Sequence, residues 1–146
     1  METLVLLAAL VSSLGGNLMS PAAGHGIVQG ELLYPACTGL PEDLQVCAEN
    51  RDTGERICTH QFFGRAGYRY RIEVPAGRYE VFAQTESARP GYRAYYSEAV
   101  RCGLRVSCTA HDPITVVVES GRTNNAISPA DWFGSDDTKG ELAWNR

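Results

Sequence analysis

The stretch YRYRIEV at residues 68–74 constrains the fold more than any other part of the chain. Apolar or aromatic residues alternate with charged ones, with Tyr68, Tyr70, Ile72 and Val74 on one side and Arg69, Arg71 and Glu73 on the other. Successive side chains of a β-strand point to opposite faces of the sheet. The pattern therefore predicts a half-buried antiparallel strand with a charged outer face.

Short strand-like segments separated by turn residues run through the rest of the chain, at residues 26–35, 43–50, 55–63, 78–85 and 113–119. No segment has the pattern of an amphipathic helix of ten or more residues. About seven short strands in a chain of 146 residues predict an all-β fold, a single antiparallel β-sandwich with one core.

The PAG sequence at residues 75–77 predicts a type I turn that leads back into the segment 78–85. Pro75 presets φ for the first central position, and Gly77 would take the left-handed position that follows. Valine resists positive φ, so Gly77→Val is expected to destabilise the domain.

The charge pattern argues against a nucleic-acid partner. The formal net charge is −4, and among 13 basic residues only Lys139 is a lysine. The arginines are scattered among acidic residues, so no basic stripe is available to neutralise a phosphate backbone.

The N-terminus, METLVLLAALVSSLGG, has an apolar run that is too short to span a bilayer and resembles the core of a secretory signal. Cleavage is expected after Ala23 or Gly24, although Glu2 replaces the usual basic residue. The predicted organisation is a signal peptide at residues 1–24, a domain at 25–133 and a polar tail at 134–146, without a transmembrane segment after cleavage. We expect a periplasmic or secreted protein.

Five cysteines predict disulfides in an exported protein, with one cysteine left over. Cys47 and Cys58 flank the turn RDTG, and pairing of Asn50 with Glu55 would place them opposite each other, as a cross-strand bridge requires. The alternative is a pair of free buried thiols. Cys37 is unassigned: it is free, pairs between two chains, or replaces a partner in another bridge.

Cys102 and Cys108 enclose a five-residue loop, with His111 and Asp112 shortly after it. A disulfide is the favoured interpretation, and it would contribute roughly 2 kcal/mol in the chain-entropy model. A metal site is the alternative, but C-x5-C with one nearby histidine lacks the ligand spacing of zinc sites. No metal and no cofactor is therefore predicted.

Two parts of the chain resemble a known family. The pattern G-x-L-x-Y-P at residues 30–35, followed by VPAGRYEVFAQ at 74–84, resembles a carboxypeptidase regulatory-like domain, a prealbumin-like β-sandwich related in shape to Cna-B modules. Residues 95–121 and SPADWF at 128–133 are similar to stand-alone bacterial secreted proteins with this domain. The resemblance covers about residues 26–133 and implies a binding or structural role, with no catalytic residues to carry over.

The residue types offer little for catalysis. Ser97 does not lie in a G-x-S-x-G motif. His60 is interpreted as a strand histidine, and His111, Asp112 and Pro113 as a turn before the last strand. His25 would become the N-terminal residue after cleavage behind Gly24, and an N-terminal histidine resembles half of the copper brace of oxidative enzymes, which needs a second histidine.

Aromatic residues are the best binding candidates, namely Tyr92, Tyr95, Tyr96, Trp132 and Phe133. Exposed rings stack on sugars and apolar ligands. The alternative is that they cap the sandwich core. Tyr95 and Tyr96 are neighbours in a predicted extended segment, so at most one of them belongs to the core.

The sequence thus predicts an exported, non-enzymatic β-sandwich with a binding, structural or accessory role at the cell envelope, whose partner is an envelope protein or a glycan. A copper-binding or oxidative enzyme that uses His25, a carbohydrate-binding module that uses the exposed aromatics, and a structural protein that self-associates through sheet edges or Cys37 are the alternatives. The sequence does not determine the oligomeric state.

Overall fold

The computed structural model describes residues 21–35, 39–64, 67–87 and 91–132. Most of the predicted signal peptide, Cys37, Phe133 and the polar tail lie outside the described residues. In the described part of the chain, no helix is long and apolar enough to cross a membrane.

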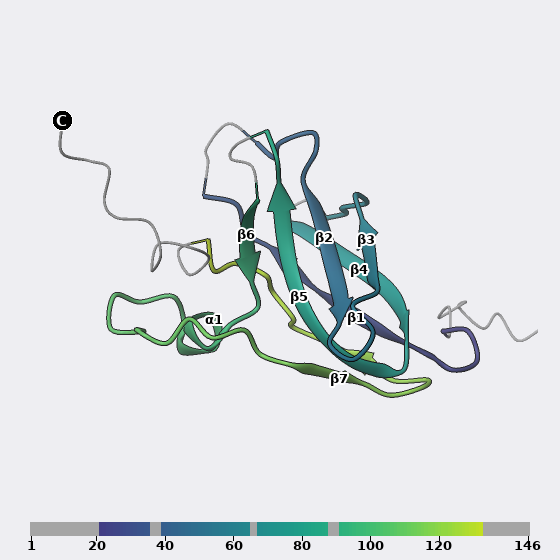
Figure 1. Cartoon of the computed structure of the whole chain (residues 1–146). Coiled ribbons are helices and arrows are strands. Elements are labelled where there is room, and N and C mark those ends of the chain that lie inside the picture. The colour runs from purple at the N-terminus through teal and green to yellow at the C-terminus, as the bar shows by residue number, and fades with distance from the viewer. Residues whose placement is uncertain (1–20, 36–38, 65–66, 88–90, 133–146) are drawn as a thin grey trace, which may run out of the picture.

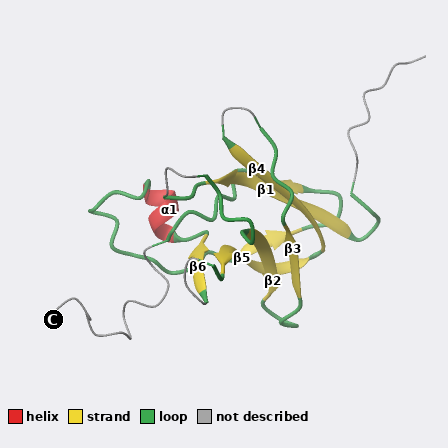
Figure 2. Cartoon of the chain, turned by 90° about the horizontal axis from the view of Figure 1, so that it is seen from above, coloured by secondary structure: helices red, strands yellow, loops and turns green. Residues whose placement is uncertain are grey.

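The described residues form eight strands in two sheets. They are β1 (His25–Leu32), β2 (Gln45–Asn50), β3 (Arg56–Thr59), β4 (Tyr68–Pro75), β5 (Gly77–Thr85), β6 (Tyr92–Tyr95), β7 (Val116–Val118) and β8 (Thr123–Asn124). One sheet has the strand order β4-β1-β8 and the other β3-β2-β5-β6, with β7 also paired to β5. Figure 2 shows β1 and β4 as one layer and β2, β3, β5 and β6 as the other. The predicted all-β, two-sheet architecture is confirmed.

One strand pair departs from the antiparallel prediction. β8 runs parallel to β1, with Ile27 opposite Thr123 and Val28 opposite Asn124. A strand of two residues is too short to have a recognisable alternation, so the pattern at residues 120–125 did not reveal it.

The core fills the space between the two sheets. Val28, Leu32, Tyr70, Ile72 and Val74 come from one sheet and Val46, Ala48, Tyr79, Val81 and Ala83 from the other. The predicted inward side of β4 is therefore confirmed from Tyr70 onward, whereas Tyr68, at the start of β4, is exposed.

The predicted turn at Gly77 is wrong. β4 pairs with β1 and β5 pairs with β2, so residues 75–77 carry the chain from one sheet to the other instead of closing a hairpin. Gly77 belongs to β5, and its φ lies outside the left-handed region. A Cβ at Gly77 would lie 2.9 Å from Nδ2 of Asn50, which is the end of a side chain.

The segment after β8 packs closely on β1. A Cβ on Gly30 would lie 2.1 Å from the carbonyl oxygen of Ile127, so only glycine permits this approach. The buried hydroxyl of Tyr70 donates a hydrogen bond of 2.6 Å to the same carbonyl, and burial raises the pKa of Tyr70 far above its usual value. These contacts fix the path of the chain toward Asp131 and Trp132.

Both predicted disulfides are present. Cys47 faces Cys58 across β2 and β3 with a Cα–Cα distance of 4.0 Å, and the amide of Asn50 donates to the carbonyl of Glu55. Cys102 and Cys108 close the second bridge with a Cα–Cα distance of 5.8 Å.

A short helix, α1 (Glu98–Cys102), follows β6. It ends at Gly103, which has a φ of 95°, in the left-handed region. In Figure 1, α1 and the loop that follows it lie beside the sheets and do not cover either face.

Candidate functional site

The aromatic residues that the sequence predicted as a binding surface do not lie on one side of the sheet. Tyr92 and Tyr96 pack against the core between the sheets, where Trp132 also lies. Tyr95 packs against Phe82 outside the core. The prediction that Tyr95 and Tyr96 point to opposite faces is therefore confirmed, and the four residues do not form one surface.

Trp132 closes one end of the core. Only 3% of it is exposed, and its Nε1 donates a hydrogen bond of 2.6 Å to the carbonyl of Leu33. Tyr34 meets the indole edge-on at 5.2 Å between ring centroids, and Tyr92 packs at 5.0 Å. The hydroxyl of Tyr92 also donates to the carbonyl of Trp132. This geometry fits the alternative that the aromatic cluster caps the core.

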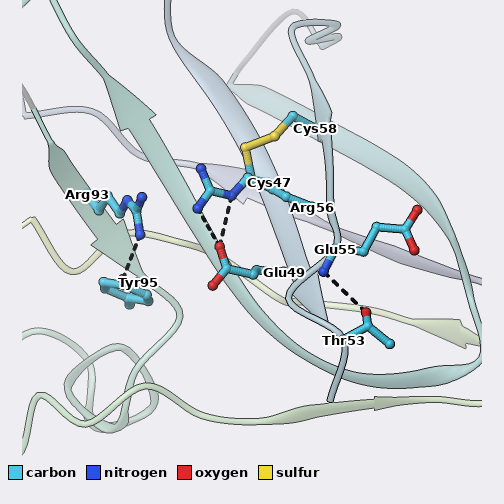
Figure 3. Close-up of polar contacts among 8 residues, drawn as sticks. All are labelled: Cys47, Glu49, Thr53, Glu55, Arg56, Cys58, Arg93 and Tyr95. Atoms are coloured by element: carbon cyan, nitrogen blue, oxygen red, sulfur yellow. Dashed lines mark hydrogen bonds and ion pairs between the residues drawn. A yellow bond between two sulfur atoms is a disulfide. The ribbon is translucent and has the colours of Figure 1, made fainter. Parts of the chain in front are cut away.

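Tyr95 belongs to a polar patch on the outer face of the five-stranded sheet, shown in Figure 3. The guanidinium of Arg93 lies 4.5 Å above the ring of Phe82, and that of Arg56 lies 5.2 Å from it. Arg56 also donates two hydrogen bonds to one carboxylate oxygen of Glu49. Because the arginines cover Phe82, Tyr95 is the one ring of this patch that is partly accessible among the described residues.

A buried carboxylate connects three segments at the junction of β6 and α1. Asp131 is 1% exposed, and its Oδ2 lies 2.9 Å from Nδ1 of His111. The hydroxyl of Ser97, which is fully buried, donates to the same oxygen at 2.5 Å. The burial of Asp131 is thus balanced by two hydrogen-bonding partners, as a buried carboxylate requires.

Backbone pairing brings these three residues together. The amide of Asp131 donates to the carbonyl of Tyr95, and the amide of Ile114 donates to that of Tyr96. Asp112 accepts a hydrogen bond from the amide of Glu98. The predicted turn at residues 111–113 is therefore wrong, because this segment runs extended beside the start of α1.

The arrangement positions an imidazole and does not activate a nucleophile. The Ser97 hydroxyl is directed at Asp131 and not at His111, and it is shielded from solvent. Asp131 engages Nδ1 of His111, which leaves Nε2 as the ring nitrogen that can meet a ligand. About a third of the His111 side chain is accessible.

His111 lines a pocket of ~370 Å³, which we call the loop pocket. Its lining residues come from α1 and the loop after it, namely Ala99, Leu104, Arg105, Val106, Cys108 and His111. Val106 is fully exposed and Leu104 is 39% exposed. Leu104 and Val106 are therefore the exposed apolar side chains of the pocket wall.

The loop pocket is held by local bonds. The Cys102–Cys108 disulfide closes the loop, and the amide of Leu104 donates to the carbonyl of Ala99. The guanidinium of Arg105 reaches back to the carbonyl of Cys102 at 3.2 Å, which satisfies a free carbonyl at the end of α1. The disulfide and these two contacts therefore hold the pocket walls together.

The other two histidines lie at opposite ends of the sandwich. His25 starts β1 opposite Pro75, next to the start of β5. His60 lies 3.3 Å from the carbonyl of Leu44, beside the other end of β5. The register therefore does not place His60 near His25. Within the described ranges, no three His, Cys, Asp or Glu side chains gather closely enough to hold a metal ion.

Sequence reasoning missed Asp131, Leu104 and Arg105. Asp131 had one signal: it lies between Ala130 and Trp132 in an otherwise apolar stretch, and a carboxylate buried among such neighbours needs a hydrogen-bonding partner. Nothing in the local sequence indicated that this partner is His111. Leu104 and Arg105 were interpreted only as the interior of a closed loop.

Comparison with known proteins leaves the function open. No protein-family model matches the chain, and the search of curated proteins found no relative. One solved structure that matches is a leucine-rich repeat protein from Bacteroides thetaiotaomicron, with 14% identity and a TM-score of 0.38. The match covers 75% of this chain and 14% of that one. A likeness this distant carries no argument about fold or function.

Proposed function

We propose that this chain is an exported, non-enzymatic β-sandwich module that binds a small ligand in the loop pocket as an accessory protein of the cell envelope. Two disulfides are compatible with an oxidising compartment such as the periplasm or the outside of the cell. The chain passes repeatedly between the two sheets, which supports the β-sandwich part of the proposal.

Leu104 is the observation that carries the proposal. It has a φ of 52°, in the left-handed region that leucine rarely adopts, and it is an apolar side chain exposed at the pocket wall. The left-handed conformation costs an ordinary residue roughly 1–2 kcal/mol. Asparagine or glycine would suit this position better for stability alone. Backbone strain at an exposed apolar residue is a feature of binding sites.

The order of the loop supports binding. A closed, internally bonded loop loses little conformational entropy when a ligand arrives, so a small contact area suffices for measurable affinity. The absence of catalysis is proposed because Ser97 is buried and directed away from His111. Asp131 and His111 then serve to fix the pocket wall.

The test is a titration of the ¹⁵N-labelled mature protein with small aromatic fragments, followed by amide chemical shifts. We expect the shifts to cluster at Ala99, Leu104, Val106 and His111. Leu104→Asn should abolish them while raising the free energy of unfolding by about 1 kcal/mol. Val117→Asn, at an exposed position of β7 away from the pocket, is the matched control and should leave binding unchanged.

Shifts that cluster elsewhere would overturn the proposal. The same protein is also titrated with a panel of glycans. Amide shift changes centred on Tyr95 would support the carbohydrate-binding alternative. Unchanged binding in Leu104→Asn would show that the loop pocket is not the site.

A further inference from the structure

We propose that the ligand of the loop pocket is a small apolar carboxylic acid, bound as its anion. This inference rests on the proposed function, namely that the loop pocket binds a ligand. It follows from the combination of an apolar wall with two nitrogen-bearing side chains that are held in place by the protein itself.

The apolar part of the ligand is indicated by the wall of the pocket. Ala99, Leu104, Val106 and the Cys108 end of the disulfide line it. A volume of ~370 Å³ lies at the lower end of the range for small-molecule sites. It suits one ring or a short alkyl chain better than an extended peptide, which needs a longer groove.

The anionic part is indicated by Arg105. It is a permanently charged residue of the pocket wall, and none of the described residues that line the pocket is acidic. Its Nε and Nη2 are directed at the carbonyl of Cys102, at 3.4 and 3.2 Å. A guanidinium has five N–H donors. The two bonds to Cys102 therefore orient the guanidinium and leave other N–H groups for a carboxylate.

His111 supplies a second, directed nitrogen. Asp131 fixes the imidazole through Nδ1, which leaves Nε2 as the ring nitrogen that can meet a ligand. The positive charge of the pocket wall comes from Arg105, and both side chains orient the ligand. Glu98 and Asp112 lie on the neighbouring segments but do not line the pocket.

The experiment compares 4-phenylbutyrate with 4-phenylbutanol, which has the same carbon skeleton without the charge. Both are titrated by calorimetry and by amide chemical shifts into the mature, disulfide-bonded protein. We expect the carboxylate to bind about tenfold more tightly than the alcohol, since a hydrogen bond to a charged group adds that much. Shifts for both ligands should map to the loop pocket.

Three variants test which residue causes the preference for the carboxylate over the alcohol. Arg105→Gln should remove most of the preference for the carboxylate and leave the affinity for the alcohol unchanged. Arg105→Lys keeps the charge and should retain part of the preference even if the contact with Cys102 is lost. Arg101→Gln, at an exposed arginine of α1 that does not line the pocket, is the matched control and should change neither affinity.

The outcomes separate this inference from the proposed function. Equal binding of both ligands in the pocket, unaffected by Arg105→Gln, would overturn the carboxylate assignment and leave the pocket as a binding site. Binding of neither ligand, together with no shifts from the aromatic fragments, would overturn both. A peptide that ends in a free phenylalanine carboxylate is tested as well. If it binds more tightly than phenylbutyrate, the ligand is a protein C-terminus and the assignment of a small acid is overturned.

Discussion

Nδ1 of His111 lies 2.9 Å from the buried carboxylate of Asp131, although 20 residues separate them in the chain. The same carboxylate accepts the hydroxyl of Ser97 at the start of α1. One acidic side chain thus holds the C-terminal segment, the helix and the wall of the loop pocket together.

Asp131→Asn is expected to destabilise the protein by about 1–3 kcal/mol, because an amide in the place of the carboxylate loses one of two buried acceptors. Urea unfolding followed by tryptophan fluorescence measures this loss. His111→Gln should cost less, since His111 is partly exposed and water can replace its contact. Equal stability of Asp131→Asn and the wild type would mean that the cluster does not tie the segments together.

Gly30→Ala is expected to destabilise the domain by about 1–3 kcal/mol, the usual range for overpacking. The new methyl group would lie 2.1 Å from the carbonyl oxygen of Ile127, and both are backbone-anchored, so neither can move aside alone. Gly67→Ala is the control, because a Cβ there meets nothing within 4 Å. Thermal unfolding compares the two variants, and a similar melting temperature for both would contradict the close approach.

The two disulfides should contribute differently to stability and order. Replacing Cys47 and Cys58 by alanine should cost roughly 3 kcal/mol, and replacing Cys102 and Cys108 about 2 kcal/mol, because the second bridge closes the shorter loop. Loss of the second bridge should also speed amide exchange at residues 104–108. Non-reducing peptide mapping of the protein checks the pairing first, and free thiols at either pair would contradict it.

Asp43 is expected to make stability depend on pH. Hydrogen bonds from the hydroxyls of Ser87 and Thr85, and from the amides of Ser87 and Glu86, hold the pKa of Asp43 well below its ordinary value of 3.8. The folded state binds a proton less readily than the unfolded state, so the stabilisation is fully present above about pH 4 and is lost as the pH falls below it.

The measurement for Asp43 is the melting temperature between pH 6 and pH 2, compared with that of Asp43→Asn. The variant should be less stable at pH 6, and the difference should shrink as the pH falls. A constant difference across this range would contradict the role of the ionised carboxylate. Glu42→Gln, next to it in the chain, is the control and should leave the profile unchanged.

The sequence by itself determined the features that depend on neighbouring residues. The alternation at residues 68–74 predicted which side of β4 is buried, because strand side chains alternate irrespective of the rest of the fold. The spacing around RDTG predicted the partner of Cys47, because a short hairpin sets its own register. The opposite orientations of Tyr95 and Tyr96 followed from the same periodicity.

Only the tertiary structure decided which distant segments meet. The sequence of residues 75–77 is compatible with a turn within one sheet and with a crossing between two sheets. Which of these forms depends on the strands that pair with β4 and β5, and these strands lie in different sheets. Likewise, Asp131 pairs with His111 because the carbonyl of Ile127 seats against Gly30 and the amide of Asp131 bonds to Tyr95. Packing between segments far apart in the chain has no local sequence period, so the loop pocket and its fixed imidazole became visible only in the folded molecule.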